Sequence, residues 1–451
     1  MQRKQFRKAT VGWFIWLYSC ALWGQYSVSG GLGTPFLAAD DTKNDLQVYM
    51  VYGTENVEIR SLSAPAGAQW YRYRTRALEA EAIPSRTEGG ASVIGGIEDG
   101  CGYFVSEPGK MTRYVWIIDY RRHAFDVASF GPAEGGDPCS TLPLEGEGQV
   151  SLLSYYTPGG TLVTLPRKGE VSYHTLSWSE DSFSFFETDT TVEVDLQPLG
   201  GDAGRFRVNV EAPLTDTPFT LKGDNFAAHF EAAKTIHSDE YPAVAVAVHA
   251  DTTLVVNEAP NMDASSEGYS APATLTFTAR ANEPVASLYI WSIFRDEQGG
   301  EENPFVRFTG EEVEYTFTEA GKYIARVQVS GPSGTCSATE EFSIEVAESF
   351  LDVPNAFSPG MTPGVNDEFR VAYKSLVRFN AWIFNRWGQE LYHWNDPARG
   401  WDGKKGGKFV PPGVYFYIIE AEGSDGKKYK KKGDINILRS KTIQTQPIET
   451  Y

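Results

Sequence analysis

Residues 383–392 read IFNRWGQELY, and residues 400–403 read GWDG. Over 379–383 the apolar residues alternate with their neighbours, which is the two-residue period of a half-buried β-strand. The chain then leaves the strand at 385–388, where Gly388 is free to adopt a positive φ. We therefore predict a strand that ends in a tight turn, with the tryptophans of both stretches, Trp387 and Trp401, filling a small core.

The stretches around this strand extend the pattern. VPNAFSPG (353–360) and VNDEFRV (365–371) precede it, and a Pro-Pro-Gly turn feeds VYFYIIEAE (414–422) after it. In this order the stretches closely resemble the gliding motility-associated C-terminal domain, the type B sorting domain of the type IX secretion system of Bacteroidota. The matching positions are Pro354, Asn355, Phe357, Ser358, Asn366, Asp367, Phe369, Asn385, Arg386, Trp387, Gly388, Gly400, Trp401, Asp402, Gly403, Gly413 and Tyr415.

The resemblance implies that residues 349–441 form a sorting domain, followed by a tail at 442–451. It further implies export across the outer membrane, with the type IX outer-membrane machinery as partner. We expect most of the matching residues to form the fold rather than to make contacts. The family usually opens with an acidic N-G-D-G-x-N-D loop, whereas here PGMTPGVND keeps only Asn366 and Asp367. We therefore predict no metal and no cofactor.

Five lysines crowd the stretch 427–432. These lysines form either a surface that contacts the secretion machinery or anionic lipopolysaccharide, or an edge strand that their charge protects. We favour the edge strand. The stretch belongs to a separate electrostatic unit. Residues 351–451 carry 15 Lys and Arg against 11 Asp and Glu, whereas the whole chain has a net charge of −19. A chain this acidic predicts no nucleic-acid partner.

The N-terminus predicts export. Four basic residues precede a twelve-residue apolar run at 11–22, which is a length typical of a signal peptide, so we expect a signal peptide at 1–25. A rival interpretation takes 17–20 (LYSC) as a lipobox that lipidates Cys20, although Tyr18 fits that motif badly. We expect the exported protein at the cell surface, associated with the outer membrane, or in the medium.

Removal of the signal leaves Cys101, Cys139 and Cys336. In an exported chain Cys101 and Cys139 are a candidate disulfide across a 37-residue interval, and Cys336 is left as a buried thiol. The spacing does not show that the two meet.

Everything after the signal is predicted to be β-structure. Aromatic residues make up 13% of the chain, alongside 44 glycines and 25 prolines, which favours strands and turns. Residues 26–122 are expected to form an N-terminal β-sandwich with Trp70 at its centre and a loop over 77–100. Residues 123–257 are expected to form a second β-domain that includes a strand run at 243–256 and a short helix within 224–234.

Residues 258–348 open with a polar stretch at 258–273 and then resemble the PKD-like and immunoglobulin-like modules of bacterial surface proteins. Trp291 stands where the buried core tryptophan of such a module lies, and Tyr323 where its strand tyrosine lies. The fold class predicted for the whole chain is all-β, a tandem of Ig-like or PKD-like β-sandwich domains.

We find no catalytic motif: no G-x-S-x-G, H-E-x-x-H, Walker loop or C-x-x-C, and six scattered histidines. The favoured hypothesis is a non-enzymatic adhesion or structural protein at the cell surface or in the medium, with a possible glycan or protein ligand. Two alternatives stay open. One is a carbohydrate-binding accessory protein, and the other is an enzyme with an unrecognised site in 26–257.

Overall fold

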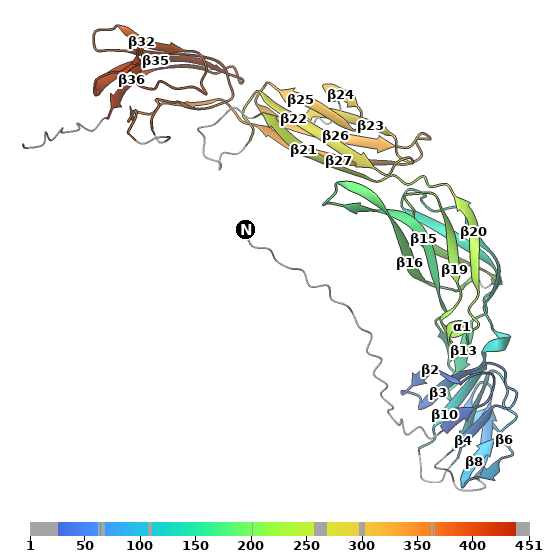
Figure 1. Ribbon diagram of the computed structural model, residues 1–451. Helices are drawn as coiled ribbons and strands as arrows, with labels where there is room; N and C mark the ends of the chain where they lie inside the picture. The colour runs from blue at the N-terminus through green and yellow to red at the C-terminus, as the bar shows by residue number, and fades with distance from the viewer. Residues whose placement is uncertain are drawn as a thin grey trace, which may run out of the picture.

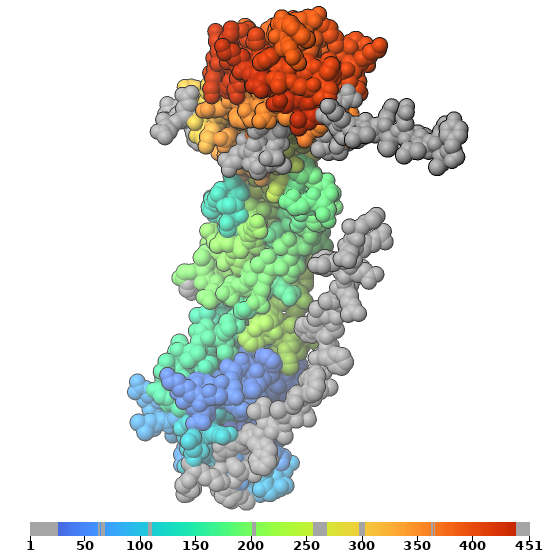
Figure 2. Space-filling view, turned by 90° about the vertical axis from the view of Figure 1, so that its left-hand side faces the viewer, coloured from blue at the N-terminus to red at the C-terminus, as the bar shows by residue number. Residues whose placement is uncertain are grey.

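The computed structural model describes residues 26–61, 64, 68–106, 111–200, 202–256, 268–296, 303–361, 364 and 366–438. The expected signal peptide, Cys20 and the tail at 442–451 lie outside the described residues. Within them, strands dominate beside one short α-helix, so the prediction of an all-β chain is confirmed. Four β-rich units follow one another in a bowed row (Figure 1), and the space-filling view shows them as a long, narrow body (Figure 2).

The first unit packs two sheets around Trp70, which is fully buried and donates from Nε1 to Ser92 Oγ at 2.8 Å. The predicted central aromatic is therefore confirmed. The expected loop over 77–100 is wrong, because the strands β6 (Glu81–Ile83), β7 (Arg86–Glu88) and β8 (Ala91–Ile94) lie within it. One sheet has the order β1 (Tyr26–Ser29), β4 (Glu58–Ser61), β8 (Ala91–Ile94), β7 (Arg86–Glu88); the other has β2 (Phe36–Asp41), β3 (Leu46–Val51), β10 (Tyr114–Asp119), β9 (Cys101–Val105), β5 (Trp70–Tyr73), β6 (Glu81–Ile83). Two 3-10 turns, η1 (Ala77–Glu79) and η2 (Tyr120–Arg122), belong to the same unit.

The second unit has its own core around Phe206 and Phe219. Its sheets have the orders β11 (Asp126–Pro132), β12 (Thr141–Gln149), β18 (Asp202–Glu211), β17 (Pro198–Leu199) and β16 (Ser184–Asp195), β15 (Lys168–Ser179), β19 (Thr217–Lys222), β20 (Thr235–Tyr241). The predicted helix is shorter than 224–234: α1 spans Asn225–His229, starts at the Asp224 cap, and is over before Glu231, whose φ is 54°.

The first two units share a core. The hairpin of β13 (Leu153–Tyr156) and β14 (Leu162–Leu165), together with α1, covers the outer face of the β3–β10 sheet. Beside it, Arg167 Nε lies 2.8 Å from Asp224 Oδ2, and both side chains are almost fully buried. Tyr120 Oη donates to Asp224 Oδ1 at 3.0 Å. The joint is therefore a packed interface with buried polar contacts rather than a bare linker between independent domains.

The third unit holds the strand run expected to close the second. β21 (Val248–Val256) pairs with β22 (Ala273–Ala281), so the assignment of 248–256 to the second block is wrong. Alternation identified a strand there but carried no information about its partner. The sheets have the orders β21, β22, β25 (Glu312–Phe317) and β24 (Val306–Thr309), β23 (Leu288–Arg295), β26 (Gly321–Ser330), β27 (Ser337–Val346). Trp291 and Tyr323 are buried in the core between these sheets, as expected.

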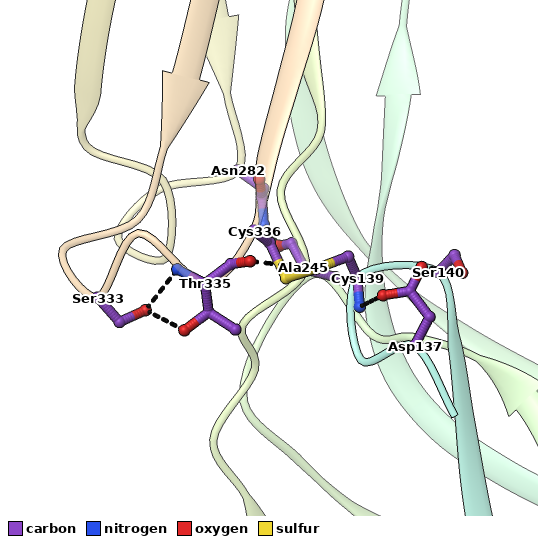
Figure 3. Close-up of a disulfide and its surroundings, with 8 residues drawn as sticks. All are labelled: Asp137, Cys139, Ser140, Ala245, Asn282, Ser333, Thr335 and Cys336. Atoms are coloured by element: carbon purple, nitrogen blue, oxygen red, sulfur yellow. Dashed lines mark hydrogen bonds between the residues drawn. A yellow bond between two sulfur atoms is a disulfide. The ribbon is translucent and has the colours of Figure 1, made fainter. Parts of the chain in front are cut away.

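A disulfide joins the second and third units (Figure 3). Cys139 is bonded to Cys336, with their Cα atoms 5.4 Å apart, and Cys101 is a free, buried thiol in the first unit. The expected pairing of Cys101 with Cys139 is therefore wrong. Cys101 lies on β9 inside the first core, whereas Cys139 lies in a turn at the other end of the second unit. Beside the disulfide, Asn282 donates to Leu214 O and Ala245 O, both at 2.8 Å.

The joint has a second contact away from the disulfide. Trp178, near the tip of the β15–β16 hairpin, stacks on His249 of β21 with ring centroids 4.1 Å apart. Phe185 of the same hairpin also contacts this ring. The two units are therefore held at two separate places, which restricts rotation about the connecting segment.

The fourth unit, here called the C-terminal module, follows without a long linker. Ser375 Oγ donates to Ala347 O at 2.6 Å and accepts from Ala271 N at 3.0 Å, and both bonds are buried or partly buried. Its main sheet has the order β29 (Ala356–Phe357), β36 (Lys428–Ile437), β35 (Gly413–Gly423), β31 (Leu376–Phe384), β32 (Glu390–Trp394). Two small ribbons complete it: β28 (Phe350–Asp352) with β30 (Ala372–Lys374), and β33 (Lys404–Lys405) with β34 (Lys408–Phe409).

Candidate functional site: the C-terminal module

The C-terminal module is built on one face of its five-stranded sheet. On β35 the odd-numbered residues Tyr415, Ile419 and Ala421 are buried, and the even-numbered residues face solvent. β31 repeats the pattern with Phe379, Ala381 and Ile383 inside, as the alternation over 379–383 predicts. Loops rather than a second full sheet cover the inner face, and most of the predicted sorting-domain residues lie in those loops.

Four of the predicted residues form the core of the module. Phe357, Phe369, Trp401 and Tyr415 are each less than one-tenth exposed. The Phe357 and Trp401 ring centroids are 5.7 Å apart, as are those of Trp401 and Tyr415. Trp401 Nε1 donates to Lys404 O at 2.9 Å, so the indole is buried with its polar atom satisfied. These side chains determine the fold of the module.

A second group shapes the loop that lies over this core. Asp367 accepts from Gly360 N at 3.2 Å and from Gly364 N at 2.6 Å, and Ser358 N donates to Asn366 O at 2.8 Å. The Asp367 carboxylate thus accepts from two backbone amides, which gives this acidic residue a role in shaping the loop. Pro354 lines a cavity of about 560 Å³ beside this loop, and Asn355 O accepts from Asn436 N at 2.9 Å.

Asn385 organises the turn after β31. Its Oδ1 accepts from Trp387 N and from Gln389 N, both at 3.0 Å, while Gly388 takes a φ of 77°. The predicted positive φ at Gly388 is confirmed. An asparagine that caps its own turn in this way fixes the register of the following strand.

The GWDG stretch brings the backbone close to its neighbours. A Cβ at Gly400 would lie 2.8 Å from Phe369 O, and a Cβ at Gly403 would lie 2.8 Å from Pro359 Cγ. Asp402 Oδ1 accepts from Lys404 N at 3.0 Å. Gly413, with a φ of 146°, starts β35. Both glycines of the stretch are therefore required by close packing around Trp401.

Two predicted residues have no place in this core. Trp387 is 80% exposed, so the expectation that both tryptophans fill the core is wrong for this one. Its backbone belongs to the Asn385 turn, which directs the side chain away from the sheet. Arg386 Cζ lies over the Trp387 ring, 5.2 Å from its centroid. These two side chains lie on the surface and are available for contact.

Sequence reasoning missed the outer face of the sheet. Phe416 and Ile418 are 44% and 38% exposed, and Phe384 on the neighbouring strand is half-buried. The signal was present in VYFYII (414–419), because a strand with one solvated face should be polar at alternate positions and this one is not.

Four of the five lysines, from Lys428 to Lys432, lie on β36, and Lys427 directly precedes that strand. Lys430 Nζ is 2.7 Å from Glu420 Oε1, and Lys431 Nζ is 3.6 Å from Asp352 Oδ1. β29 pairs only with Asn436 and Ile437, so β36 is an edge strand over most of its length. Lysines at such an edge oppose pairing with other chains.

Among the described residues, no cluster of three or more His, Cys, Asp or Glu side chains could hold a metal ion. A Ser–His–Asp grouping does occur where the first two units meet. His123 Nε2 is 3.0 Å from Asp99 Oδ2, and Ser151 Oγ is 3.5 Å from His123 Nδ1. Asp99 Oδ1 also accepts from Asp119 N at 2.7 Å. The serine contact is at the outer limit of a hydrogen bond, and the carboxylate is engaged in the backbone of the joint.

The described part of the chain contains no helix with the length and apolar character needed to cross a bilayer. This agrees with the predominance of β-strands among the described residues.

Comparison with known proteins assigns two segments. Residues 351–437 match the CHU_C Type IX secretion signal domain, and residues 132–238 match a fibronectin type III domain. The fibronectin match thus falls on the second unit, whereas the sequence resemblance to a PKD-like module was drawn on the third. No curated protein matches the chain.

Solved structures give broader similarity. A tetra-tandem repeat from the extending region of a large adhesion protein is 10% identical, covering 87% of this chain and 99% of its own, with a TM-score of 0.22. The FN1–FN3 domains of chicken CNTN1 are 13% identical, covering 69% and 99%, with a TM-score of 0.23. Dimeric latent PorU from Porphyromonas gingivalis is 11% identical, covering 67% and 32%, with a TM-score of 0.15. Values this low carry no argument about function.

The family matches and the sheets together settle the class of the chain. The protein carries a type IX secretion signal domain at 351–437, preceded by fibronectin type III or immunoglobulin-like β-domains.

Proposed function

We propose that this protein is a cargo of the type IX secretion system and acts at the cell surface or in the medium as a non-catalytic spacer or adhesion protein. The observation that carries the proposal is the C-terminal module. It has a complete core of its own, and it matches a type IX secretion signal domain. A signal peptide at 1–25 would deliver the chain to the periplasm, and the module would then direct it across the outer membrane.

The spacer role rests on the joints. The first two units share a core and the hydrogen bond from Tyr120 to Asp224, the second and third share a disulfide, and the third and fourth share hydrogen bonds of Ser375 that are buried or partly buried. Each joint opposes bending, so the first and fourth units are held at opposite ends of the row (Figure 1). A row of stiffly joined β-domains is suited to presenting its distal unit away from a membrane.

Localisation tests this function. The intact chain and a truncation that ends at Ser349 are expressed in a bacterium with a working type IX system. We expect the intact chain at the surface or in the medium and the truncation in the periplasm. A matched control, Val377→Thr, changes an exposed side chain of the module that is 51% accessible and should leave export unchanged. Equal export of the intact and truncated chains would contradict the proposal.

A carbohydrate-binding role is the second candidate, and one observation favours it. On the first unit the rings of Tyr71 and Phe104 are stacked 5.2 Å apart, with Tyr114 5.1 Å beyond Phe104, and all three are only half-buried. Sugars bind to exposed aromatic rings by stacking. Binding on a glycan array that Tyr71→Ala abolishes would support this candidate, and no binding to any glycan would remove it.

A further inference from the structure

The C-terminal module has an apolar patch on the face of its sheet that its own core does not use. Phe384, Phe416 and Ile418 project from neighbouring strands β31 and β35 on the solvent side, with Phe384 opposite Phe416 in the strand register. Trp387 lies in the turn that follows β31. All of these side chains are partly or largely exposed in the full chain.

The patch lies along a shallow, open groove. A groove of about 650 Å³ is lined by Phe384, Arg386, Gly388, Phe416, Ile418 and Lys432, and we call it the Phe416 groove. Asp434 lies at its edge, opposite Phe416 on β36. Among the described residues Lys432 forms no ion pair, in contrast to Lys430 and Lys431 on the same strand. The groove is therefore apolar at its floor, and its rim carries two basic side chains, Arg386 and Lys432, against the single carboxylate of Asp434.

This composition is that of a binding surface rather than of an ordinary solvated face. Exposed apolar side chains grouped in one place, with a polar rim, mark interaction sites on soluble proteins. Tryptophan and arginine are the residue types that most often dominate binding energy, and Trp387 with Arg386 stands beside the groove. Neither side chain contributes to the core around Trp401.

We propose that the Phe416 groove is the surface through which the module docks on the outer-membrane secretion machinery. The inference rests on the proposed function and names the chemistry of its partner: a protein surface with an apolar protrusion flanked by carboxylates. Charge complementarity supports this occupant. Residues 351–451 carry an excess of four basic charges within a chain of net charge −19, so an acidic surface attracts the module and repels the other units. The same surface would therefore select which end of the cargo arrives first.

The test uses the full chain in a bacterium with a working type IX system. Trp387→Ala and Phe416→Thr each remove an apolar side chain from the patch, and threonine keeps the strand propensity of the site. Val377→Thr on β31 is the matched control for Phe416→Thr, because Val377 is 51% exposed against 44% for Phe416 and lies outside the groove. Thermal unfolding of each purified variant establishes that the module still folds. A photo-crosslinking amino acid at position 418 then identifies what covers the groove.

We expect both patch variants to lower the exported fraction about tenfold or more, as loss of a dominant contact does, with Val377→Thr unchanged. The crosslink at position 418 should then join an outer-membrane component of the secretion system. Normal export of both patch variants, with the truncation at Ser349 still retained in the periplasm, overturns the groove but leaves the proposed function standing. Export of the truncation itself overturns the proposed function. A crosslink only to a second copy of this chain, or only within the chain to residues 439–451, overturns the groove as a docking surface for the machinery.

Discussion

Arg167 and Asp224 form an ion pair of 2.8 Å between Nε and Oδ2 in a place almost closed to water. Burial lowers the pKa of the Arg167 guanidinium, and the Asp224 charge opposes that shift. Asp224 also accepts from Phe226 N and Ala227 N, so the same carboxylate caps α1. One carboxylate thus connects a loop, a helix and the Tyr120 hydroxyl of the preceding unit.

Removing the arginine should therefore open this joint. We expect Arg167→Met to cost about 3–5 kcal/mol, because it leaves a buried carboxylate without its counter-charge. Hydrogen exchange of the amides in 220–230 measures the change. The double variant Arg167→Met with Asp224→Asn should cost less than the single one, since Asn keeps the helix cap and removes the charge. An equal or larger loss in the double variant would contradict the assignment.

Trp401 and Trp387 of the C-terminal module should respond oppositely to substitution. Trp401→Ala removes a fully buried ring and should destabilise the C-terminal module by about 3–5 kcal/mol. Trp387→Ala removes an exposed ring and should change stability by no more than about 0.5 kcal/mol. Urea unfolding of the purified chains, followed by a probe in the module, compares them. Similar losses in both would show that Trp387 is buried after all.

The disulfide predicts a thiol pattern. In a chain that starts at residue 26, the unreduced, denatured protein should expose one thiol, and peptide mapping should find residues 139 and 336 in one crosslinked species. The variant Cys101→Ala should have no free thiol. Two free thiols in that variant would instead show that Cys139 and Cys336 are not bonded to each other.

Acid should weaken the joint beside His123. Desolvation by burial would raise the pKa of Asp99, but hydrogen bonds from His123 and from the Asp119 amide outweigh it and leave that pKa below its usual 3.8. Arg122 adds a further favourable charge. A carboxyl whose pKa is lower in the folded than in the unfolded chain stabilises the fold at pH values above its unfolded-state pKa. It loses that contribution as the pH falls through its folded-state pKa. We therefore expect the stability of the first unit to decline below about pH 4. In Asp99→Asn this part of the pH dependence should disappear.

Ser151 should not act as a nucleophile. Its contact with His123 is 3.5 Å long, and Asp99 is engaged by the backbone. We expect a fluorophosphonate probe to leave Ser151 unlabelled, with a known serine hydrolase as positive control. Labelling that Ser151→Ala and His123→Ala both abolish would reopen the hypothesis of an enzyme within 26–257.

The sequence was most informative where side-chain type and backbone geometry are tied together. Gly388 and the buried Trp401 could be predicted because a turn needs a positive φ and a small sheet needs a large apolar cover. The exposure of Trp387 could not be predicted, because a side chain at the end of a strand can face either side of the sheet. Only the turn that Asn385 organises determines which side Trp387 faces. The short strands β6 and β7 were missed because three residues rich in charge show no period.

Pairings between distant segments were beyond the sequence. The run at 248–256 is recognisable as a strand, but its neighbour β22 follows a long polar stretch, and alternation says nothing about which sheet receives it. The same holds for the cysteines. Cys139 and Cys336 are 197 positions apart and lie in different units, so the shorter interval to Cys101 was a poor guide.

The position of that disulfide also determines what a single cut would do to the chain. The segment between β20 and β21 is the only backbone connection between the second and third units, and it runs beside the bond between Cys139 and Cys336 (Figure 3). A protease that cleaves there would produce two fragments still joined covalently. The nicked protein would run as two pieces on a reducing gel and as one without reductant. The first two units would therefore remain attached to the C-terminal module after cleavage.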